Sequence, residues 1–413
     1  MEFEKADEVE LIYQSSDDDK IFRDENTVFI KFSHKRNGLI SSWLNGGYSE
    51  DLDAVFNHQI SQQAIDEDED SQLDMGAYLS HLSSLWADRF DLDSFKSSGL
   101  ITSAKMINTG ISALRYRNLE VVSISTAGTN VNAASAGDPA SYYEENGDFD
   151  LNILDSDDKN QDLSDLSLSN SEDFKRDLSV SNSEDFKRDL SLFNNDNFKS
   201  NSRPDLKGTN NSIVLINSKL DESSLVMALM TATEAKTVAL RDLKIASRYS
   251  DEIATGTGTD GIAVFSNLDS ENKLEIAGKH SKLGELIAKT VIYSIKKALA
   301  RQIWMTPTYQ SNALIRLDRY DVDLDKFYNE YLKVACEKEK QEFIKSLVKV
   351  NKNPDLVAYV SLALETLDQY RQGLISKKTA NVVLDSLLEN QFAPKEYEAM
   401  KTLVKFIIKE KLD

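Results

Sequence analysis

The chain has 413 residues and a formal net charge of −21, with 69 acidic against 48 basic side chains. This acidity excludes nucleic acid as a partner, because neutralising phosphates requires a basic face. The single cysteine, Cys336, excludes disulfides and thiolate metal sites. The acidic N-terminus is unlike a secretory signal, and no run of about 18 apolar residues could span a membrane. We therefore expect a soluble cytoplasmic protein without a membrane partner, and the composition leaves its oligomeric state open.

The first part of the chain predicts short strands and covering helices. Thr27–Phe32 alternates apolar and polar side chains, as a half-buried strand does. Asp221 suits the N-cap of a helix that ends near Leu243, and apolar residues four apart predict a second helix, which ends near Trp304. Short β-branched or apolar runs predict further strands at Leu119–Ser125, Ser212–Asn217 and Ile262–Phe265. Strands mixed with helices predict an α/β or α+β mixed-sheet domain over residues 1–309.

An acidic segment interrupts this domain at residues 146–207. It holds 16 apolar, 15 acidic and 8 basic residues, and an 11-residue stretch, SNSEDFKRDLS, occurs at Ser169–Ser179 and again at Ser181–Ser191. So little apolar surface cannot offset the entropy of ordering the chain. We interpret the segment as an acidic, low-complexity, largely disordered insertion.

From Tyr320 onward only helical patterns occur. Pro354 and Pro394 suit first helical turns, and Gly373 suits a C-terminal cap. The predicted helices are Leu324–Cys336, Lys340–Val350, Pro354–Gln372, Lys377–Asn390 and Pro394–Leu412. The sequence thus predicts a separate all-helical C-terminal domain over residues 320–413.

Two threonine-rich motifs indicate a site in the first domain. Thr231–Thr237 (TATEAKT) lies within an otherwise apolar helix, and Ala254–Gly261 (ATGTGTDG) runs into a strand. A core helix has no need of so many hydroxyls, and a loop needs three glycines only where it turns sharply or something approaches it closely. The glycines also fit G-x-G-x-x-G, but a dinucleotide turn needs a strand before it and a helix after it. Here polar residues precede the motif and a strand follows it.

With these motifs, the first domain resembles the adenosylcobinamide amidohydrolases of corrinoid salvage. Leu39–Gly47 (LISSWLNGG) is similar to that family's serine-serine…asparagine-glycine-glycine segment. The other matching segments occur in the family's order: Gly99–Ala104, Ala127–Asn130, Ala136–Pro139, the two threonine-rich motifs, and Gly278–Glu285. The insertion and the helical tail depart from the family without interrupting a motif.

The resemblance implies hydrolysis of the amide between the corrin ring and its aminopropanol arm, which yields adenosylcobyric acid and 1-amino-2-propanol. Adenosylcobinamide would be the small-molecule substrate, and no cofactor and no metal site is identified. The predicted catalytic residues, in order of preference, are Glu234, Asp260 and His280. Glu234 comes first because a carboxylate on a largely apolar helix is expected to be partly buried. The predicted substrate-binding residues are Ser41, Ser42, Asn45, Gly46, Gly47, Asn130, Thr231, Thr233, Lys236, Thr255, Gly256, Thr257, Gly258 and Thr259.

Each of these residues also has a structural interpretation. Glu234 could be a helix-surface ion-pair partner, Asp260 could cap the turn before its strand, and His280 could lie in a helix cap. A non-catalytic corrinoid-binding protein and a nicotinamide-dependent enzyme are the alternative functions. The tail faintly resembles an archaeal alpha-ribazole phosphatase module, which would make the protein bifunctional, but residues 375–413 lack that module's acidic metal-binding motif.

Overall fold

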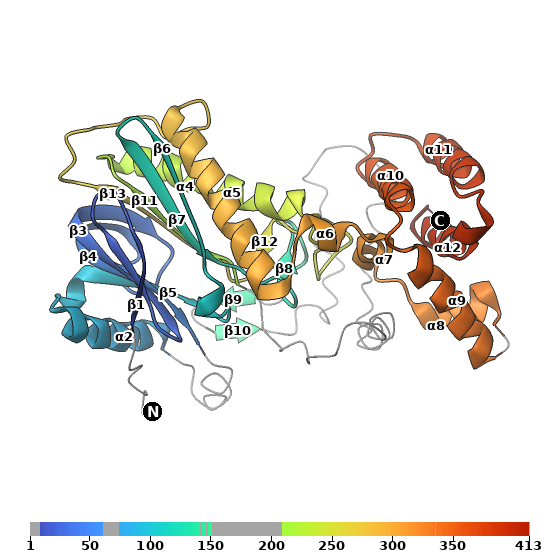
Figure 1. Ribbon diagram of the computed structural model, residues 1–413, viewed down its shortest axis with the longest axis horizontal. Coiled ribbons are helices and arrows are strands. Elements are labelled where there is room, and N and C mark those ends of the chain that lie inside the picture. Colours follow the sequence, from blue (N-terminus) through green and yellow to red (C-terminus); the bar gives the residue numbers. More distant parts are fainter. Residues whose placement is uncertain are drawn as a thin grey trace.

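The computed structural model describes residues 9–60, 74–140, 143–145, 148–150, 209–334 and 336–412. Figure 1 shows two parts, a sheet unit (the described residues from 9 to 303) and a helical unit (residues 313–412). The predicted fold class is confirmed: a mixed sheet with covering helices precedes an all-helical region. Most of the predicted insertion, residues 151–207, lies outside the described residues. No helix of the described part is long and apolar enough to cross a membrane.

A curled sheet of nine strands forms the first unit. Its main path runs β1-β2-β3-β13-β11-β7-β6, and β4 pairs with the other edge of β3 and with β5. Parallel pairs join β11 to β13 and β4 to β5, while the remaining pairs are antiparallel. The strands are β1 (Glu10–Gln14), β2 (Lys20–Arg23), β3 (Thr27–Ile40), β4 (Gly47–Gln59), β5 (Ser97–Thr102), β6 (Gly110–Tyr116), β7 (Leu119–Thr126), β11 (Asn211–Ile216) and β13 (Gly261–Asn267).

Three helices pack on this sheet (Figure 1). α4 (Glu222–Asp242) and α5 (Lys282–Ile303) cover one face, and α2 (Met75–Phe90) packs on β3 and β4. Successive side chains of β11 point to opposite faces of the sheet, so the strand contributes to two hydrophobic cores. Val214 packs toward α4 and α5, whereas Ile213 packs into the inside of the curl. Two small ladders lie outside the main sheet: β8 (Ala133–Ala134) with β12 (Gly256–Thr257), and β9 (Tyr143–Glu145) with β10 (Asp148–Asp150).

Local sequence signals account for the two long helices. The Asp221 side chain accepts a hydrogen bond from the Ser224 amide at 2.8 Å, as expected for the N-cap of α4. The Ser281 side chain caps α5 in the same way, and Trp304 ends α5 in the left-handed conformation. Both predicted helices are therefore confirmed to within a few residues.

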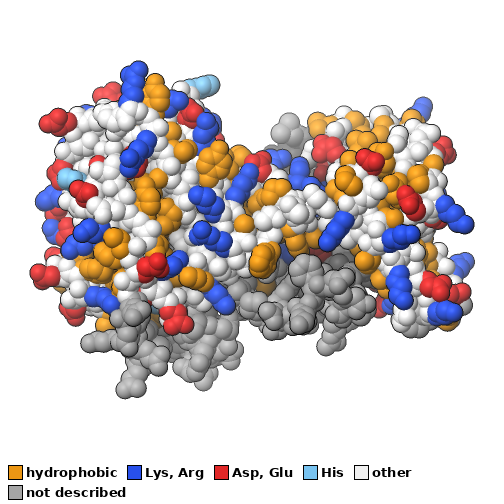
Figure 2. Space-filling model, in the orientation of Figure 1, with side chains coloured by type: hydrophobic (Ala, Val, Ile, Leu, Met, Phe, Trp, Pro, Cys, Tyr) orange, Lys and Arg blue, Asp and Glu red, His pale blue; other side chains and the backbone are white. Residues whose placement is uncertain are grey.

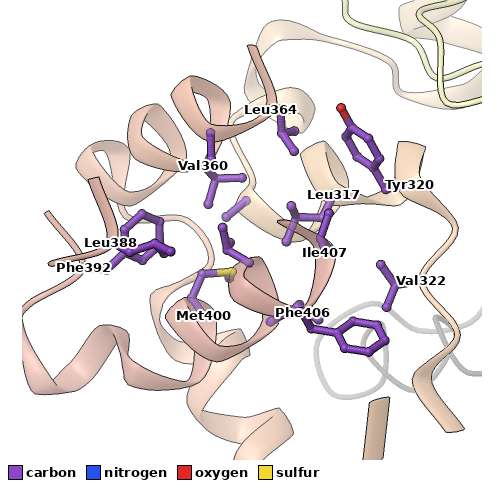
Figure 3. Packing of buried hydrophobic residues seen from close by; sticks show 14 of the residues in the cluster. Leu317, Tyr320, Val322, Val360, Leu364, Leu388, Phe392, Met400, Phe406 and Ile407 are labelled. Carbon is purple, nitrogen blue, oxygen red and sulfur yellow. The ribbon is translucent and has the colours of Figure 1, made fainter. Parts of the chain in front are cut away.

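The helical unit has its own core. Figure 3 shows apolar side chains from several helices, among them Leu364, Met400 and Ile407, pointing toward one another. Its helices are α7 (Ala313–Leu317), α8 (Leu324–Lys326), α9 (Glu337–Val350), α10 (Pro354–Arg371), α11 (Lys377–Asn390) and α12 (Glu398–Leu412), and the short α6 (Pro307–Gln310) precedes them. The predicted helix Leu324–Cys336 is too long, because α8 passes into a π-helical turn that ends at Leu332. Cys336 is exposed at the start of α9.

Candidate active site

The motif Ala254–Gly261, which we call the site loop, is built around an ion pair. Asp260 Oδ2 pairs with Lys236 Nζ from α4, and both side chains are largely buried. Asp260 Oδ1 accepts hydrogen bonds from the amide and the hydroxyl of Thr257, at 3.1 and 2.6 Å. A Cβ at Gly256 would overlap the Asp260 carboxylate and lie 2.9 Å from Lys236 Nζ. Glycine is required there because the backbone passes directly over the ion pair.

Asn132 holds the other half of the site loop. Its Nδ2 donates to Thr259 Oγ1 at 3.1 Å, and its Oδ1 accepts from the Gly258 amide at 3.3 Å. The Thr259 hydroxyl also lies 2.8 Å from the hydroxyl of Thr209, which precedes β11. On the other side of the loop, the Ala136 amide donates to Thr255 Oγ1 at 2.8 Å. The segments around Asn130 and Ala136 therefore lie beside the site loop, although more than 110 residues separate them in sequence.

The N-terminal motif lies against the strand that the site loop enters. The Ser41 amide donates to the Ile262 carbonyl at 3.0 Å, and Ser41 Oγ accepts from the Ile262 amide at 2.8 Å. Ser42 Oγ and Asn45 Nδ2 instead donate to the carbonyls of Gly99 and Ser97, both at 2.6 Å. These two side chains hold their own turn against β5.

Glycines 46 and 47 allow that turn to form. A Cβ at Gly46 would overlap the Ser42 carbonyl, and Gly47 has a φ of 76°. Within the N-terminal motif Leu39–Gly47, Ser41 thus lies at the start of β13, next to the site loop.

Glu234 lies on a different face of α4 from Lys236. Two residues of an α-helix are separated by a rotation of about 200°, so the two side chains diverge. Glu234 forms an ion pair with Lys279, and its side chain is 49% exposed. The partial burial expected of this carboxylate is not found, because its position faces away from the sheet.

The other predicted residues of this region lie near Glu234. Thr231 Oγ1 donates to the Ala277 carbonyl at 3.0 Å, and the exposed Thr233 bonds within its own helix to Leu229. His280 is exposed, and within the described residues its imidazole has no hydrogen-bond or ion-pair partner. Among the described residues, no hydrogen bond or ion pair joins Glu234 or His280 to Asp260. The three predicted catalytic residues therefore form two groups, and their roles stay predictions.

Sequence reasoning missed a group of buried amides where β11 begins. Asn211 Nδ2 donates to Asn57 Oδ1 at 2.8 Å and to the Ile101 carbonyl at 2.9 Å, while Asn57 Nδ2 donates to Thr126 Oγ1 at 2.9 Å. Asn210 is 1% exposed, and neither its Oδ1 nor its Nδ2 has a partner among the described residues. The signal was present in the sequence: two asparagines directly precede a strongly apolar strand.

A depression of about 280 Å³ lies where β6 ends and α5 begins, and Lys282 and Glu285 of the segment Gly278–Glu285 line part of it. Its charges are paired within the protein: Glu285 contacts Lys282 and Lys289. These two ammonium groups lower the pKa of the Glu285 carboxyl to about 2. The depression contains none of the predicted site residues, and its lining charges are already matched. Its lining residues are Leu114, Arg115, Tyr116, Lys282, Glu285, Leu286, Lys289 and Tyr293.

A mixed sheet whose threonine-rich loop holds a lysine–aspartate pair is compatible with a hydrolase class of protein. The particular family follows from comparison with known proteins: the adenosylcobinamide amidohydrolase profile matches residues 11–307, and the chain belongs to this family. The chain is also 43% identical over 96 residues to an uncharacterized protein of Methanocaldococcus jannaschii. That alignment covers 23% of this chain and 37% of the relative.

Proposed function

We propose that the chain hydrolyses adenosylcobinamide at the amide that links the corrin ring to aminopropanol, releasing adenosylcobyric acid and 1-amino-2-propanol. The observation that carries this proposal is the family match over residues 11–307. The geometry supports it, because segments matching the family meet around one carboxylate–ammonium pair, Asp260 with Lys236.

Amide hydrolysis needs a nucleophile, a group that accepts and returns its proton, and donors for the developing oxyanion. We assign the proton transfer to the Asp260 carboxylate, which already accepts the hydroxyl hydrogen of Thr257. The Lys236 ammonium holds this carboxylate in place and contributes positive charge where the oxyanion develops. Glu234 and His280, on the adjoining surface, are proposed to contact the substrate rather than the reacting atoms.

The direct test is to incubate the purified protein with adenosylcobinamide and to follow both products by chromatography. We expect adenosylcobyric acid and aminopropanol in equal amounts. A folded protein that shifts the visible spectrum of the corrinoid without releasing aminopropanol would instead be a binding protein, and the proposal would be wrong.

A further inference from the structure

A hairpin links the site loop to the helical unit. Residues 245–254, which we call the site hairpin, lead from α4 directly into the site loop. Ala246 bridges to Ile253, and the hairpin is closed by hydrogen bonds from the Ser247 amide to the Glu252 carbonyl at 2.9 Å and from the Ala254 amide to the Ile245 carbonyl at 2.8 Å. The site hairpin therefore lies between the site loop and the helical unit, and a displacement of one can reach the other through it.

One side of the site hairpin supports the residues that hold the site loop. The Tyr249 hydroxyl donates to Asn132 Oδ1 at 3.1 Å, and this oxygen also accepts from the Gly258 amide. The hydroxyls of Ser247 and Ser250 donate to the two carboxylate oxygens of Asp138. Asn132 thus joins Tyr249 by hydrogen bonds to the loop that carries Asp260.

The backbone reinforces this support. The Arg248 amide donates to the Ala133 carbonyl at 2.8 Å, next to the short ladder in which Ala133 pairs with Thr257. A displacement of the site hairpin would therefore move β8 and, through it, β12 of the site loop.

The other side of the site hairpin is clamped by the helical unit. Lys411 Nζ from α12 pairs with Asp251 at 2.7 Å. Arg371, at the end of α10, reaches Asp251 at 3.6 Å and Glu252 at 3.5 Å. Each of these two basic side chains is less than one-third exposed.

A further pair joins Arg248 to Asp318 at 3.4 Å. In Figure 2 the two units form lobes on either side of a narrower middle. One surface ion pair contributes little to stability, whereas several that converge on one hairpin can fix its position together.

We propose that the helical unit is a positioning element for the active site, and that Lys411 and Arg371 set the geometry of the site loop by clamping Asp251 and Glu252. This inference rests on the proposed function for its catalytic consequence only. It assigns a role to a region beyond the family match, which ends at residue 307. Asp251 and Glu252 act through the site hairpin on Asn132 and β8, so they are positioning residues and not catalytic ones.

The test uses the full chain and Lys411→Glu, which places two carboxylates opposite each other. We expect amide hydrogen exchange in peptides covering residues 254–261 to speed up about tenfold, because the loop opens more easily. We also expect kcat to fall about tenfold with little change in KM, because a small misplacement of catalytic groups costs rate rather than binding. Lys409→Glu is the matched control, since it makes the same charge change at an exposed position of the same helix.

Rescue separates positioning from simple destabilisation. The double variant Lys411→Glu with Asp251→Asn removes the repulsion without placing a cation beside Arg371, and its amide can donate a hydrogen bond to the new carboxylate, so exchange and kcat should return toward wild type. Lys411→Met provides a milder variant if the reversal unfolds the helical unit. Unchanged exchange and kcat in folded Lys411→Glu and Lys411→Met, or effects that the second substitution at Asp251 does not reverse, would overturn the proposal. If wild type shows no turnover, the proposed function is wrong, while the exchange measurement still tests the clamp.

Discussion

Both ends of the parallel pair β11–β13 are rich in polar groups, but the groups at the two ends have different surroundings. Where the strands begin, Asp260 of the site loop pairs with Lys236, and the buried amide of Asn210 has no partner among the described residues. Where they end, the two terminal nitrogens of the buried Arg36 guanidinium contact Asp19, Asp17 and the Ile216 carbonyl. A buried polar cluster therefore does not identify a site by itself.

The sharpest test of this comparison is Asp260→Asn. The amide keeps the size of the carboxylate but cannot accept a proton, so we expect kcat to fall about 10²–10⁴-fold, the usual contribution of acid–base catalysis. Glu234→Gln should lower kcat less than about tenfold, because its carboxylate is exposed and paired with Lys279. Steady-state kinetics of both variants decides between them. The reverse ranking would restore Glu234 as the leading residue.

At the other end of the strands we expect a large loss of stability without loss of chemistry. Asp19→Ala leaves the buried Arg36 without its main counter-charge, which should lower the free energy of unfolding by about 3–5 kcal/mol. Asp269→Ala, at a half-exposed position nearby, should change it by less than about 1 kcal/mol. Urea unfolding measures both. A small effect of Asp19→Ala, or a loss of kcat in the folded variant, would show that the two ends are not functionally distinct.

A third region, on the outer side of β4, makes the stability of the protein depend on pH. The His58 ring is hydrogen-bonded to Thr27 Oγ1 at 2.9 Å and to the Tyr78 hydroxyl at 3.1 Å, and burial lowers its pKa to about 4. The folded state thus favours the neutral ring. This contribution is complete above the unfolded pKa of 6.5 and is lost as the pH falls toward 4.

We therefore expect the wild type to lose about 2 kcal/mol by pH 5 and about 3 kcal/mol by pH 4 relative to His58→Gln, in which this group cannot titrate. Urea unfolding at several pH values measures the difference between the two proteins. Parallel pH profiles would show that His58 is not the group responsible.

The smallest expected effect concerns the unmatched amide. Asn210→Ala should leave the melting temperature unchanged or slightly raised, because the amide it removes has no partner among the described residues. If Asn210 serves the site, kcat/KM should fall about tenfold, the equivalent of one lost hydrogen bond to substrate. Asn57→Ala is the matched control. Its amide is bonded to Thr126 and Asn211, so the loss there should be in stability. Unchanged kcat/KM in Asn210→Ala would remove Asn210 from the site.

Features encoded by neighbouring residues were predictable from the sequence. The caps and periodicity of α4 and α5 and the apolar runs of β7, β11 and β13 are local, and they predicted these elements. The strand β4 was not predicted, because Glu50, Asp51 and Asp53 interrupt its pattern. It is stabilised by pairing with β3 and β5, which a local pattern does not contain.

The site could be predicted only as a set of segments. The pattern of the helix showed that Glu234 and Lys236 share α4, but which of them faces the site loop depends on how the helix packs on the sheet. The contact between Asn57 and Asn211 joins residues 154 positions apart. The site hairpin was overlooked because its polar sequence carries no signal of the charges that clamp it from Arg371 and Lys411.

The exposed thiol at the start of α9 allows the protein to be labelled with a fluorescent dye at one position. Cys336 is the single cysteine of the chain, so a maleimide dye attaches to the helical unit alone without any prior mutagenesis. The three tryptophans, Trp43, Trp86 and Trp304, all lie in the sheet unit or directly after it, so tryptophan emission can serve as the energy donor to a matched acceptor at Cys336. The fluorescence of one labelled chain then reports the separation of the two units in solution, with and without the corrinoid.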